Sequence, residues 1–253
     1  MSNLKSFNDL IQDAVSHSFS GWDFSFLGAR WKTNEPSWDY PALARNHMRS
    51  ITTMLDQDTG GGELLSTLIP FPPHTWATES YAPNIPVAKD HLEPLGVQVI
   101  SDYSDSSIPL PDAGLDLVLN RHGSYSEEEL LRLLKPGGIF LTEQVGGQND
   151  ICLNELLQDQ VEFEYSYWTK DLITRRLTDA GFELLIIKEE FPLAEFADIG
   201  AVVFYLRIIS WQVADFTVDK YRDKLHNIHQ DILTHGPLQV HDHRILVEAR
   251  KPY

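Results

Sequence analysis

The sequence of 253 residues lacks most of the features that mark secreted or nucleic-acid-binding proteins. Its single cysteine, Cys152, excludes an internal disulfide and fits a reducing compartment. Only 20 Lys and Arg residues accompany 37 Asp and Glu residues. The resulting formal net charge of −17 argues against a large phosphate-binding surface, because affinity for nucleic acid depends heavily on basic side chains.

Long hydrophobic runs are missing as well. The longest, at about residues 199–209, is interrupted by Arg207 and is too short to span a bilayer. Near the N-terminus, Lys5, Asp9 and Asp13 interrupt what would otherwise resemble the apolar segment of a signal peptide. We therefore expect a cytoplasmic protein that has no membrane partner, and its charge disfavours nucleic acid as a partner without excluding a local basic groove. No feature of the sequence indicates an oligomeric state.

What the sequence does contain is an ordinary apolar fraction, 42%, and an alternation of strand-like and helix-like patterns from Met54 onward. This alternation is typical of a parallel sheet with helices on both faces, and so of the α/β class. Strands are predicted near residues 51–56, 74–79, 97–101, 115–120, 138–145, 182–188 and 238–251. Helices are predicted near residues 3–17, 41–50, 62–69, 85–95, 126–135 and 168–180.

A glycine-rich turn, Asp56-Gln-Asp58-Thr-Gly60-Gly-Gly62, follows the first predicted strand of the sheet. A loop of this kind between a strand and a helix presents backbone N–H groups to a ligand. Glycine lets the ligand approach, because no side chain intervenes and because positive φ is allowed. On its own, the turn is as consistent with a plain connection as with a binding site.

Three further segments favour the binding site. The strand at 74–79 ends in Glu79, at a spacing where a carboxylate meets a nucleotide ribose. Residues 108–119 read Ile-Pro-Leu-Pro-Asp-Ala-Gly-Leu-Asp-Leu-Val-Leu, and residues 134–138 read Leu-Lys-Pro-Gly-Gly. In this order, and over about residues 50–146, the four segments resemble the class I S-adenosylmethionine-dependent methyltransferases, in particular the small-molecule, type 11-like enzymes.

The resemblance implies a Rossmann-like sheet of seven strands in the order 3-2-1-4-5-7-6, with the last strand antiparallel, and S-adenosylmethionine as the cofactor. The residues that it places at the cofactor are Asp56, Asp58, Gly60, Gly62, Glu79, Asp105 and Asn120. Glu79 would accept hydrogen bonds from both ribose hydroxyls, and Asp105, or else Asp102, would contact the adenine. Asp58 replaces the first glycine of the family's loop, where its carboxylate would either crowd the methionine end or contact its ammonium group.

Methyl transfer from a sulfonium donor needs alignment and exclusion of water more than a protein nucleophile, so the lack of a nucleophile motif is expected. Arg121 and His122 follow the fourth predicted strand, at the carboxyl edge where ligands bind in open α/β sheets. His122 could accept a proton from the methyl acceptor, and Arg121 could hold an acidic substrate. The alternative is that both residues cap strand and helix ends.

The domain organisation that we expect is a core with two additions. Residues 1–50 form a helical and aromatic lid, and residues 51–191 form the cofactor-binding core. An insertion at 192–236, with an amphipathic helix, forms a cap, and residues 237–253 complete the sheet. We expect a small-molecule acceptor to bind between residues 121–122, the aromatic N-terminal segment and this insertion, although the insertion is equally consistent with a helix packed on the sheet.

The sequence predicts no metal site. His226 with His229, and His241 with His243, have spacings that could present two ligands on one face, but no carboxylate or cysteine motif completes a site. We interpret them as surface histidines. The leading function is methyl transfer to oxygen or nitrogen of a small molecule. The alternatives are a ribosomal-RNA methyltransferase, a cofactor-binding regulator or partner subunit without catalysis, and a nicotinamide-dependent oxidoreductase.

Overall fold

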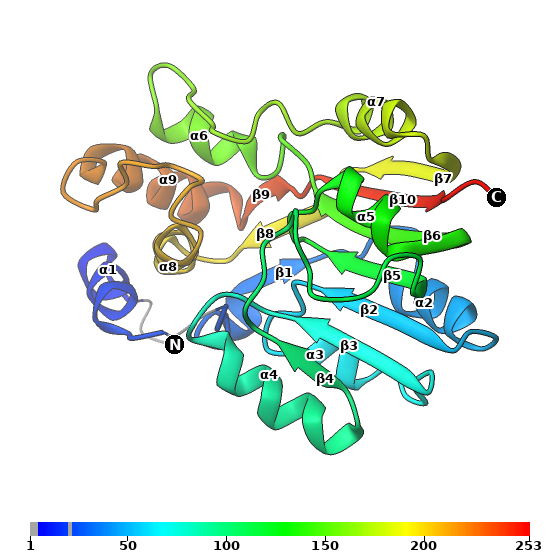
Figure 1. The fold of residues 1–253 in the computed structure, drawn as a ribbon. Helices are drawn as coiled ribbons and strands as arrows, with labels where there is room; N and C mark the ends of the chain where they lie inside the picture. The colour runs from blue at the N-terminus through cyan, green and yellow to red at the C-terminus, as the bar shows by residue number, and fades with distance from the viewer. Residues whose placement is uncertain (1–4, 20–21) are drawn as a thin grey trace. The chain divides into compact units, whose positions relative to one another are not determined.

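The chain divides into two compact units. A computed structural model describes residues 5–19 and 22–253 of them (Figure 1). The sheet unit comprises Ser37–Val145, Trp168–Glu190 and Arg244–Tyr253. The accessory unit comprises Met1–Pro36, Gly146–Tyr167 and Phe191–His243.

The sheet unit is built on a seven-stranded sheet in the order β4-β3-β2-β5-β6-β10-β7 (Figure 1). Its strands are β2 (Thr53–Gln57), β3 (His74–Thr78), β4 (Gln98–Ile100), β5 (Leu115–Arg121), β6 (Leu134–Val145), β7 (Glu183–Glu190) and β10 (Arg244–Arg250). β10 is antiparallel to both of its neighbours, β6 and β7. Numbered within the sheet alone, this order is 3-2-1-4-5-7-6 with the last strand antiparallel, so the predicted fold class and topology are confirmed.

Helices cover both faces of this sheet because successive strand residues point to opposite sides. Met54 of β2 belongs to one buried apolar cluster and its neighbour Leu55 to the other. The helices of the sheet unit are α2 (Tyr40–Met48), α3 (Glu63–Ser66), α4 (Asn84–Leu92), α5 (Glu127–Leu133) and α7 (Lys170–Ala180). The first three pack into the cluster of Met54, and the last two into the cluster of Leu55.

The ends of α5 show how local sequence fixes these helices. The Ser126 hydroxyl accepts a hydrogen bond from the Glu129 backbone N–H and so caps the start of the helix. The Glu129 carboxylate, in contrast, does not return to the cap but accepts from the Ile108 N–H at 2.6 Å and from Arg132. At the other end, the Lys251 ammonium donates to the carbonyls of Leu131 and Leu134, where a cation complements the helix dipole.

The accessory unit has its own three-stranded antiparallel sheet in the order β1-β8-β9, and its own apolar core. The strands are β1 (Trp31–Thr33), β8 (Leu193–Phe196) and β9 (Leu238–His241), and the helices are α1 (Phe7–Ser16), α6 (Ile151–Leu157), α8 (Ile199–Ile208) and α9 (Arg222–His235). The apolar run at 199–209 forms α8, whose residues are almost all buried. In the part of the chain that the structure describes, no helix is long and apolar enough to cross a membrane.

Two boundaries differ from the expected organisation. Residues 37–50 lie in the sheet unit, where α2 contributes Ala44 and Met48 to the core, whereas residues 146–167 lie in the accessory unit. The single strand predicted for residues 238–251 is wrong, because it is two strands in different sheets. The Asp242 N–H still donates to the Pro192 carbonyl, next to β8, whereas the His243 N–H donates to the Asn149 side chain, and β10 begins at Arg244.

Candidate functional site

The glycine-rich turn is held at the carboxyl end of β2 by contacts with β3. The Asp58 N–H donates to the Thr78 hydroxyl at 3.0 Å, and the Thr59 N–H donates to the Thr78 carbonyl at 2.9 Å. Asp58 has a φ of 58°, in the left-handed region that a non-glycine residue seldom adopts. The helix that follows, α3, has only four residues, which is shorter than the predicted 62–69 because prolines follow it.

The two outer glycines of the turn have different functions in the structure. A Cβ placed on Gly60, at φ 66°, would meet open space. A Cβ placed on Gly62, at φ 80°, would come within 2.7 Å of the Leu92 side chain on α4. Gly60 therefore leaves the surface of the turn open to a ligand, whereas Gly62 lets the turn pack against α4.

Two buried carboxyl groups flank the turn. Asp56 lies inside β2 with 9% of its surface exposed, and burial raises the pKa of this carboxyl to about 7. Glu79 follows β3 directly and is 6% exposed. Its Oε1 accepts a hydrogen bond from the Tyr81 N–H at 2.6 Å. No described residue donates to its Oε2, so this oxygen is available to a ligand.

Asp58 and Asp105 converge at the same edge of the sheet, on loops that follow β2 and β4. The Tyr103 hydroxyl donates to Asp58 Oδ1, and the Ser124 hydroxyl donates to Asp105 Oδ2 at 2.7 Å. The side chain of Asp58 lies over the turn after β5, since a Cβ on Gly123 would come within 2.5 Å of the Asp58 Cβ. Burial, reinforced by the nearby Asp105 and Glu79 carboxylates, raises the pKa of Asp58 to about 6.

The structure thus brings Asp56, Asp58, Gly60, Glu79 and Asp105 to one edge of the sheet. Asp102, the alternative adenine contact, is exposed on the same loop as Asp105. The roles of these residues toward a cofactor stay predictions.

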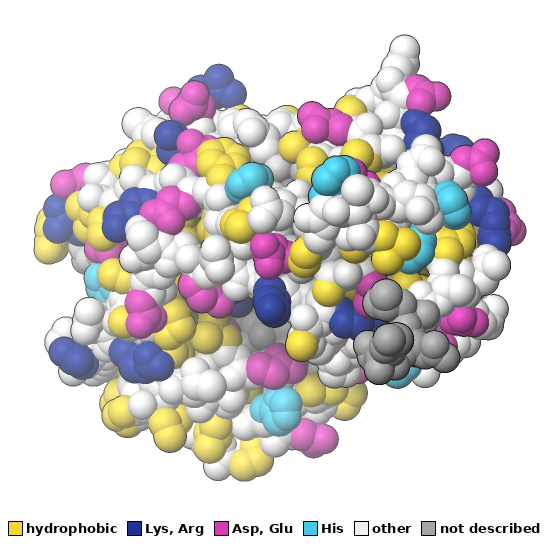
Figure 2. All heavy atoms as spheres, turned by 180° about the vertical axis from the view of Figure 1, so that it is seen from behind, with side chains coloured by type: hydrophobic (Ala, Val, Ile, Leu, Met, Phe, Trp, Pro, Cys, Tyr) yellow, Lys and Arg dark blue, Asp and Glu magenta, His cyan; other side chains and the backbone are white. Residues whose placement is uncertain are grey.

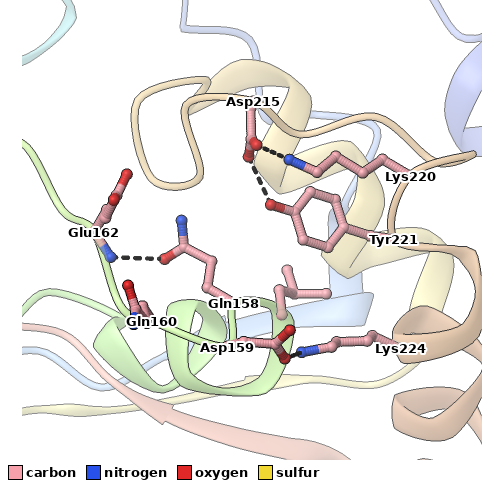
Figure 3. Close-up of a pocket in the computed structure, with 9 residues that line it drawn as sticks. Gln158, Asp159, Gln160, Glu162, Asp215, Lys220, Tyr221 and Lys224 are labelled. Carbon is pink, nitrogen blue, oxygen red and sulfur yellow. Dashed lines mark hydrogen bonds and ion pairs between the residues drawn. The ribbon is translucent and has the colours of Figure 1, made fainter.

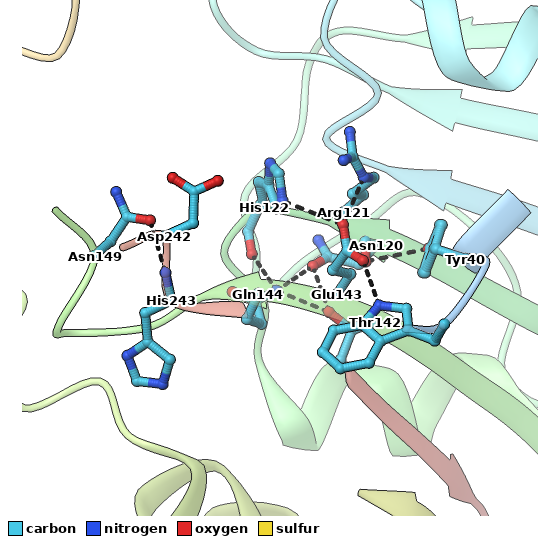
Figure 4. Close-up of polar contacts among 12 residues, drawn as sticks. Tyr40, Asn120, Arg121, His122, Thr142, Glu143, Gln144, Asn149, Asp242 and His243 are labelled. Atoms are coloured by element: carbon cyan, nitrogen blue, oxygen red, sulfur yellow. Dashed lines mark hydrogen bonds and ion pairs between the residues drawn. The ribbon is translucent and has the colours of Figure 1, made fainter. Parts of the chain in front are cut away.

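Asn120, near the end of β5, is fully buried in a network of amide and hydroxyl groups (Figure 4). Its Oδ1 accepts from the Gln144 amide at 2.7 Å and from the Thr142 hydroxyl at 3.1 Å. Its Nδ2 donates to the carbonyls of Gln57 and Ser124. Protein partners therefore use both ends of the Asn120 amide, which ties the turn after β5 to β2 and β6.

Arg121 and His122 both contact Glu143, a residue of β6 whose side chain is 4% exposed (Figure 4). Arg121 Nε lies 2.9 Å and His122 Nε2 3.4 Å from Glu143 Oε1. The Trp38 indole N–H donates to Glu143 Oε2 at 2.6 Å. Although Glu143 is buried, these donors lower its pKa to about 2, so it is ionised at neutral pH.

Glu143 was not among the candidate residues, and Trp38 was considered only as part of the aromatic N-terminal segment expected beside the acceptor. A usable signal existed for Glu143, because it is an acidic residue near the carboxyl end of a predicted strand, where ligands bind in open α/β sheets. For Trp38 no such signal existed, because 105 positions separate it from its partner.

The histidine pairs are partly corrected by the structure. His226 and His241 are exposed, as expected for surface residues, but His229 and His243 are 6% and 1% exposed. Apolar rings explain their burial: the ring centroid of Phe7 lies 5.5 Å from that of His229, and the Phe191 ring stacks on His243 at 4.5 Å. Among the described residues, no group of three or more His, Cys, Asp or Glu side chains has the arrangement of a metal site.

The accessory unit contains a pocket of about 310 Å³ between α6 and α9 (Figure 3). Four of its charged side chains form two ion pairs, Lys220 with Asp215 and Lys224 with Asp159 at 2.5 Å, and Glu162 also lines it. The Tyr221 hydroxyl donates to Asp215 at 2.6 Å. Because both lysines of this pocket are already paired with carboxylates within it, they do not indicate an anionic ligand.

No protein-family model and no curated protein matches the sequence. Solved structures do match the fold. A proposed methyltransferase from Bacillus halodurans has a TM-score of 0.60 and 20% identity, over 85% of this chain and 99% of that one. The [4+2]-cyclase SpnF has a TM-score of 0.51 and 17% identity, over 97% of this chain and 93% of that one.

A third match is a proposed sarcosine dimethylglycine methyltransferase from Galdieria sulphuraria, with a TM-score of 0.50 and 12% identity over 83% of this chain and 81% of that one. Together with the strand order, these matches show that the chain has the Rossmann-like fold of the class I S-adenosylmethionine-dependent methyltransferases. At such identities the likeness concerns the fold alone, and one of the three proteins is named for a cyclisation.

Proposed function

We propose that this protein is an S-adenosylmethionine-dependent methyltransferase that acts on oxygen or nitrogen of a small molecule. The observation that carries the proposal is Glu79. It is a buried carboxylate placed directly after β3, with Oε1 held by the Tyr81 N–H and Oε2 free of donors from the described chain. A carboxylate fixed in this way is suited to accept hydrogen bonds from two ribose hydroxyls.

The neighbouring residues fit the rest of such a cofactor. Gly60 leaves the turn open on its Cβ side, and Asp58, Glu79 and Asp105 surround the turn with acidic groups. A ligand that carries a sulfonium and an ammonium group gains from this negative charge. Asp58 would face the ammonium group, and Asp105 the adenine. When bound, the cofactor supplies an electrophilic methyl group, and the chain aligns the acceptor and excludes water.

A small-molecule acceptor is supported over ribosomal RNA by the charge of the protein. The formal net charge is −17. On the face drawn in Figure 2, Lys and Arg side chains are scattered among acidic and uncharged ones. RNA binding draws most of its affinity from basic side chains that contact phosphates. We therefore expect no methyl transfer to protein-free ribosomal RNA.

The test is a calorimetric titration of the wild-type protein with S-adenosylmethionine, its demethylated product and NAD. The proposal predicts binding of the first two and none of NAD. Binding of NAD alone would instead support an oxidoreductase. Transfer of label from methyl-labelled cofactor to a panel of hydroxylated and amino compounds, with ribosomal RNA in parallel, then tests the acceptor class.

A second candidate, a cofactor-binding regulator without catalysis, is favoured by one observation. Asp58 occupies the position of a loop glycine, and its carboxylate is already engaged by the Tyr103 hydroxyl. If Asp58 obstructs the cofactor, Asp58→Gly should tighten binding of S-adenosylmethionine. If Asp58 contacts the ammonium group, the same substitution should weaken binding, which is the result that we expect.

A further inference from the structure

We propose that Glu143 is a positioning residue that holds His122 in the tautomer whose Nδ1 can accept a proton from the methyl acceptor. The proposal rests on the proposed function, because it concerns the base of that same reaction. It applies to acceptors that arrive protonated, such as hydroxyl groups, since these must lose a proton when they gain a methyl group.

Glu143 is placed by two hydrogen-bond donors, Trp38 and Arg121, and lies beside His122. Trp38, before α2, donates to Oε2 at 2.6 Å, and Arg121 Nε donates to Oε1 at 2.9 Å. His122 Nε2 lies 3.4 Å from the same Oε1. With Trp38 on one oxygen and Arg121 on the other, the buried carboxylate has a fixed orientation toward the imidazole.

The charge of Glu143 determines which nitrogen of His122 carries the proton. Glu143 is ionised, because its donors hold its pKa far below neutrality. A carboxylate can only accept hydrogen bonds, so the nitrogen that faces it, Nε2, must be the protonated one in the neutral ring. Nδ1 then carries the lone pair. When Nδ1 takes a second proton, the imidazolium that forms is stabilised by the same carboxylate.

The backbone of His122 gives independent support. Its φ of 65° lies in the left-handed region, and its N–H donates to the Glu143 carbonyl at 2.8 Å. A non-glycine residue in this conformation costs free energy, and such residues concentrate at functional sites, where the surrounding structure maintains them. Here a backbone bond and a side-chain contact to the same residue, Glu143, maintain it.

The charges around His122 keep it available as a base at neutral pH. Burial lowers the pKa of His122, although 32% of its side chain remains exposed, and the positive charges of Arg121 and Arg244 act in the same direction. Glu143 raises the pKa and partly offsets them. His122 is therefore neutral at pH 7, while Glu143 makes its protonation more favourable than Arg121 and Arg244 alone would allow.

In the proton-transfer step, the O–H bond of the acceptor breaks and its proton goes to Nδ1 of His122. The oxygen keeps the electron pair and forms the new bond to the methyl group of the sulfonium donor. The pair of the broken carbon–sulfur bond stays on sulfur, which becomes a neutral thioether. No oxidant or reductant takes part.

The test is nitrogen NMR of histidine-labelled protein without any acceptor, with the His122 signals assigned by their loss in His122→Gln. In the wild-type protein we expect the Nε2–H tautomer at pH 8. In Glu143→Gln, the pKa of His122 should fall by about one unit, because a nearby anion that favours the charged form has been removed. Glu143→Asp, which keeps the charge, should recover part of this shift.

A matched control exists in the same unit. His47 Nε2 lies 3.3 Å from Glu248 Oε2, so Glu248→Gln removes an equivalent carboxylate without touching Glu143. It should leave the His122 pKa unchanged. An Nδ1–H tautomer in the wild-type protein would overturn the proposal even if the variants failed to fold. An unchanged His122 pKa in folded Glu143→Gln would overturn it too. Both readouts are independent of cofactor binding, whose failure would count against the proposed function instead.

Discussion

The sheet unit and the accessory unit differ in where their buried polar groups lie and in how they are assembled along the chain. In the sheet unit, buried acids and amides gather at the carboxyl ends of β2, β3, β5 and β6, and no described residue donates to the second carboxylate oxygen of Glu79. In the accessory pocket, both lysines pair with carboxylates, and these side chains are exposed. This difference is why we place the proposed binding site at the edge of the sheet and not in the accessory pocket.

The two units also differ in what their sequences reveal. The sheet unit follows local signals: a glycine turn after β2, an acid after β3 and a Ser126 cap on α5 were all readable in the sequence. The accessory sheet is formed by β1, β8 and β9, which are separated by long stretches of chain. β1 and β8, of three and four residues, were not predicted, and the pairing of the three strands depends on tertiary contacts.

The residues of the candidate site were predictable from the sequence only where they lie next to the end of a strand. Residues adjacent to a strand end, such as Glu79 and His122, could be chosen from sequence because topology brings strand ends together. The Glu143–Trp38 contact could not, because it joins β6 to a segment outside any regular element. The burial of His229 and His243 was missed because spacing alone does not show that Phe7 and Phe191 cover their rings.

The largest expected effect is the loss of stability when one buried phenylalanine in the core of either unit is truncated. Phe204 in α8 and Phe140 in β6 are both fully buried, and truncation of either to alanine should lower the free energy of unfolding by about 3–5 kcal/mol. All proposed cofactor residues lie in the sheet unit. We therefore expect Phe204→Ala to spare the affinity for S-adenosylmethionine wherever the protein is folded. Denaturant unfolding and calorimetry check this, and lost binding in folded Phe204→Ala would contradict it.

An intermediate effect concerns pH. The pKa of Asp58 is raised to about 6, so the folded state favours the protonated carboxyl group. The protonated group therefore adds to the free energy of unfolding below about pH 4, and this contribution is lost as the pH rises through about 6. Asp58→Asn, which stays neutral, should therefore stabilise the protein at pH 8, by about 1–2 kcal/mol after allowance for solvent screening. The gain should disappear near pH 4.

The matched substitution in the accessory unit is Asp159→Asn. The ion pair with Lys224 lowers the pKa of the exposed Asp159, so its charged form is the favoured one and no gain at pH 8 is expected. Unfolding curves at the two pH values decide between these outcomes. Equal gains for both variants would show that net charge, and not burial of Asp58, is responsible.

The smallest expected effect should be the same in both units. Ser6 caps α1 and Ser126 caps α5, and each hydroxyl accepts from a backbone N–H three residues later at 3.3 Å. Replacement of either serine by alanine should cost about 1 kcal/mol, the usual value for a helix cap. If the two substitutions lowered the free energy of unfolding by very different amounts, the serine caps would not contribute equally to stability in the two units.

The central claim is that the carboxyl edge of the sheet binds S-adenosylmethionine through Glu79, and calorimetric titration of Glu79→Ala tests it most directly. Loss of a hydrogen-bonding charged partner should weaken binding by about 1.5–3 kcal/mol, roughly 10- to 150-fold. Asp90→Ala, at an exposed acid of α4 that has no proposed role, is the control and should bind like the wild-type protein. Undiminished affinity in correctly folded Glu79→Ala would contradict the account.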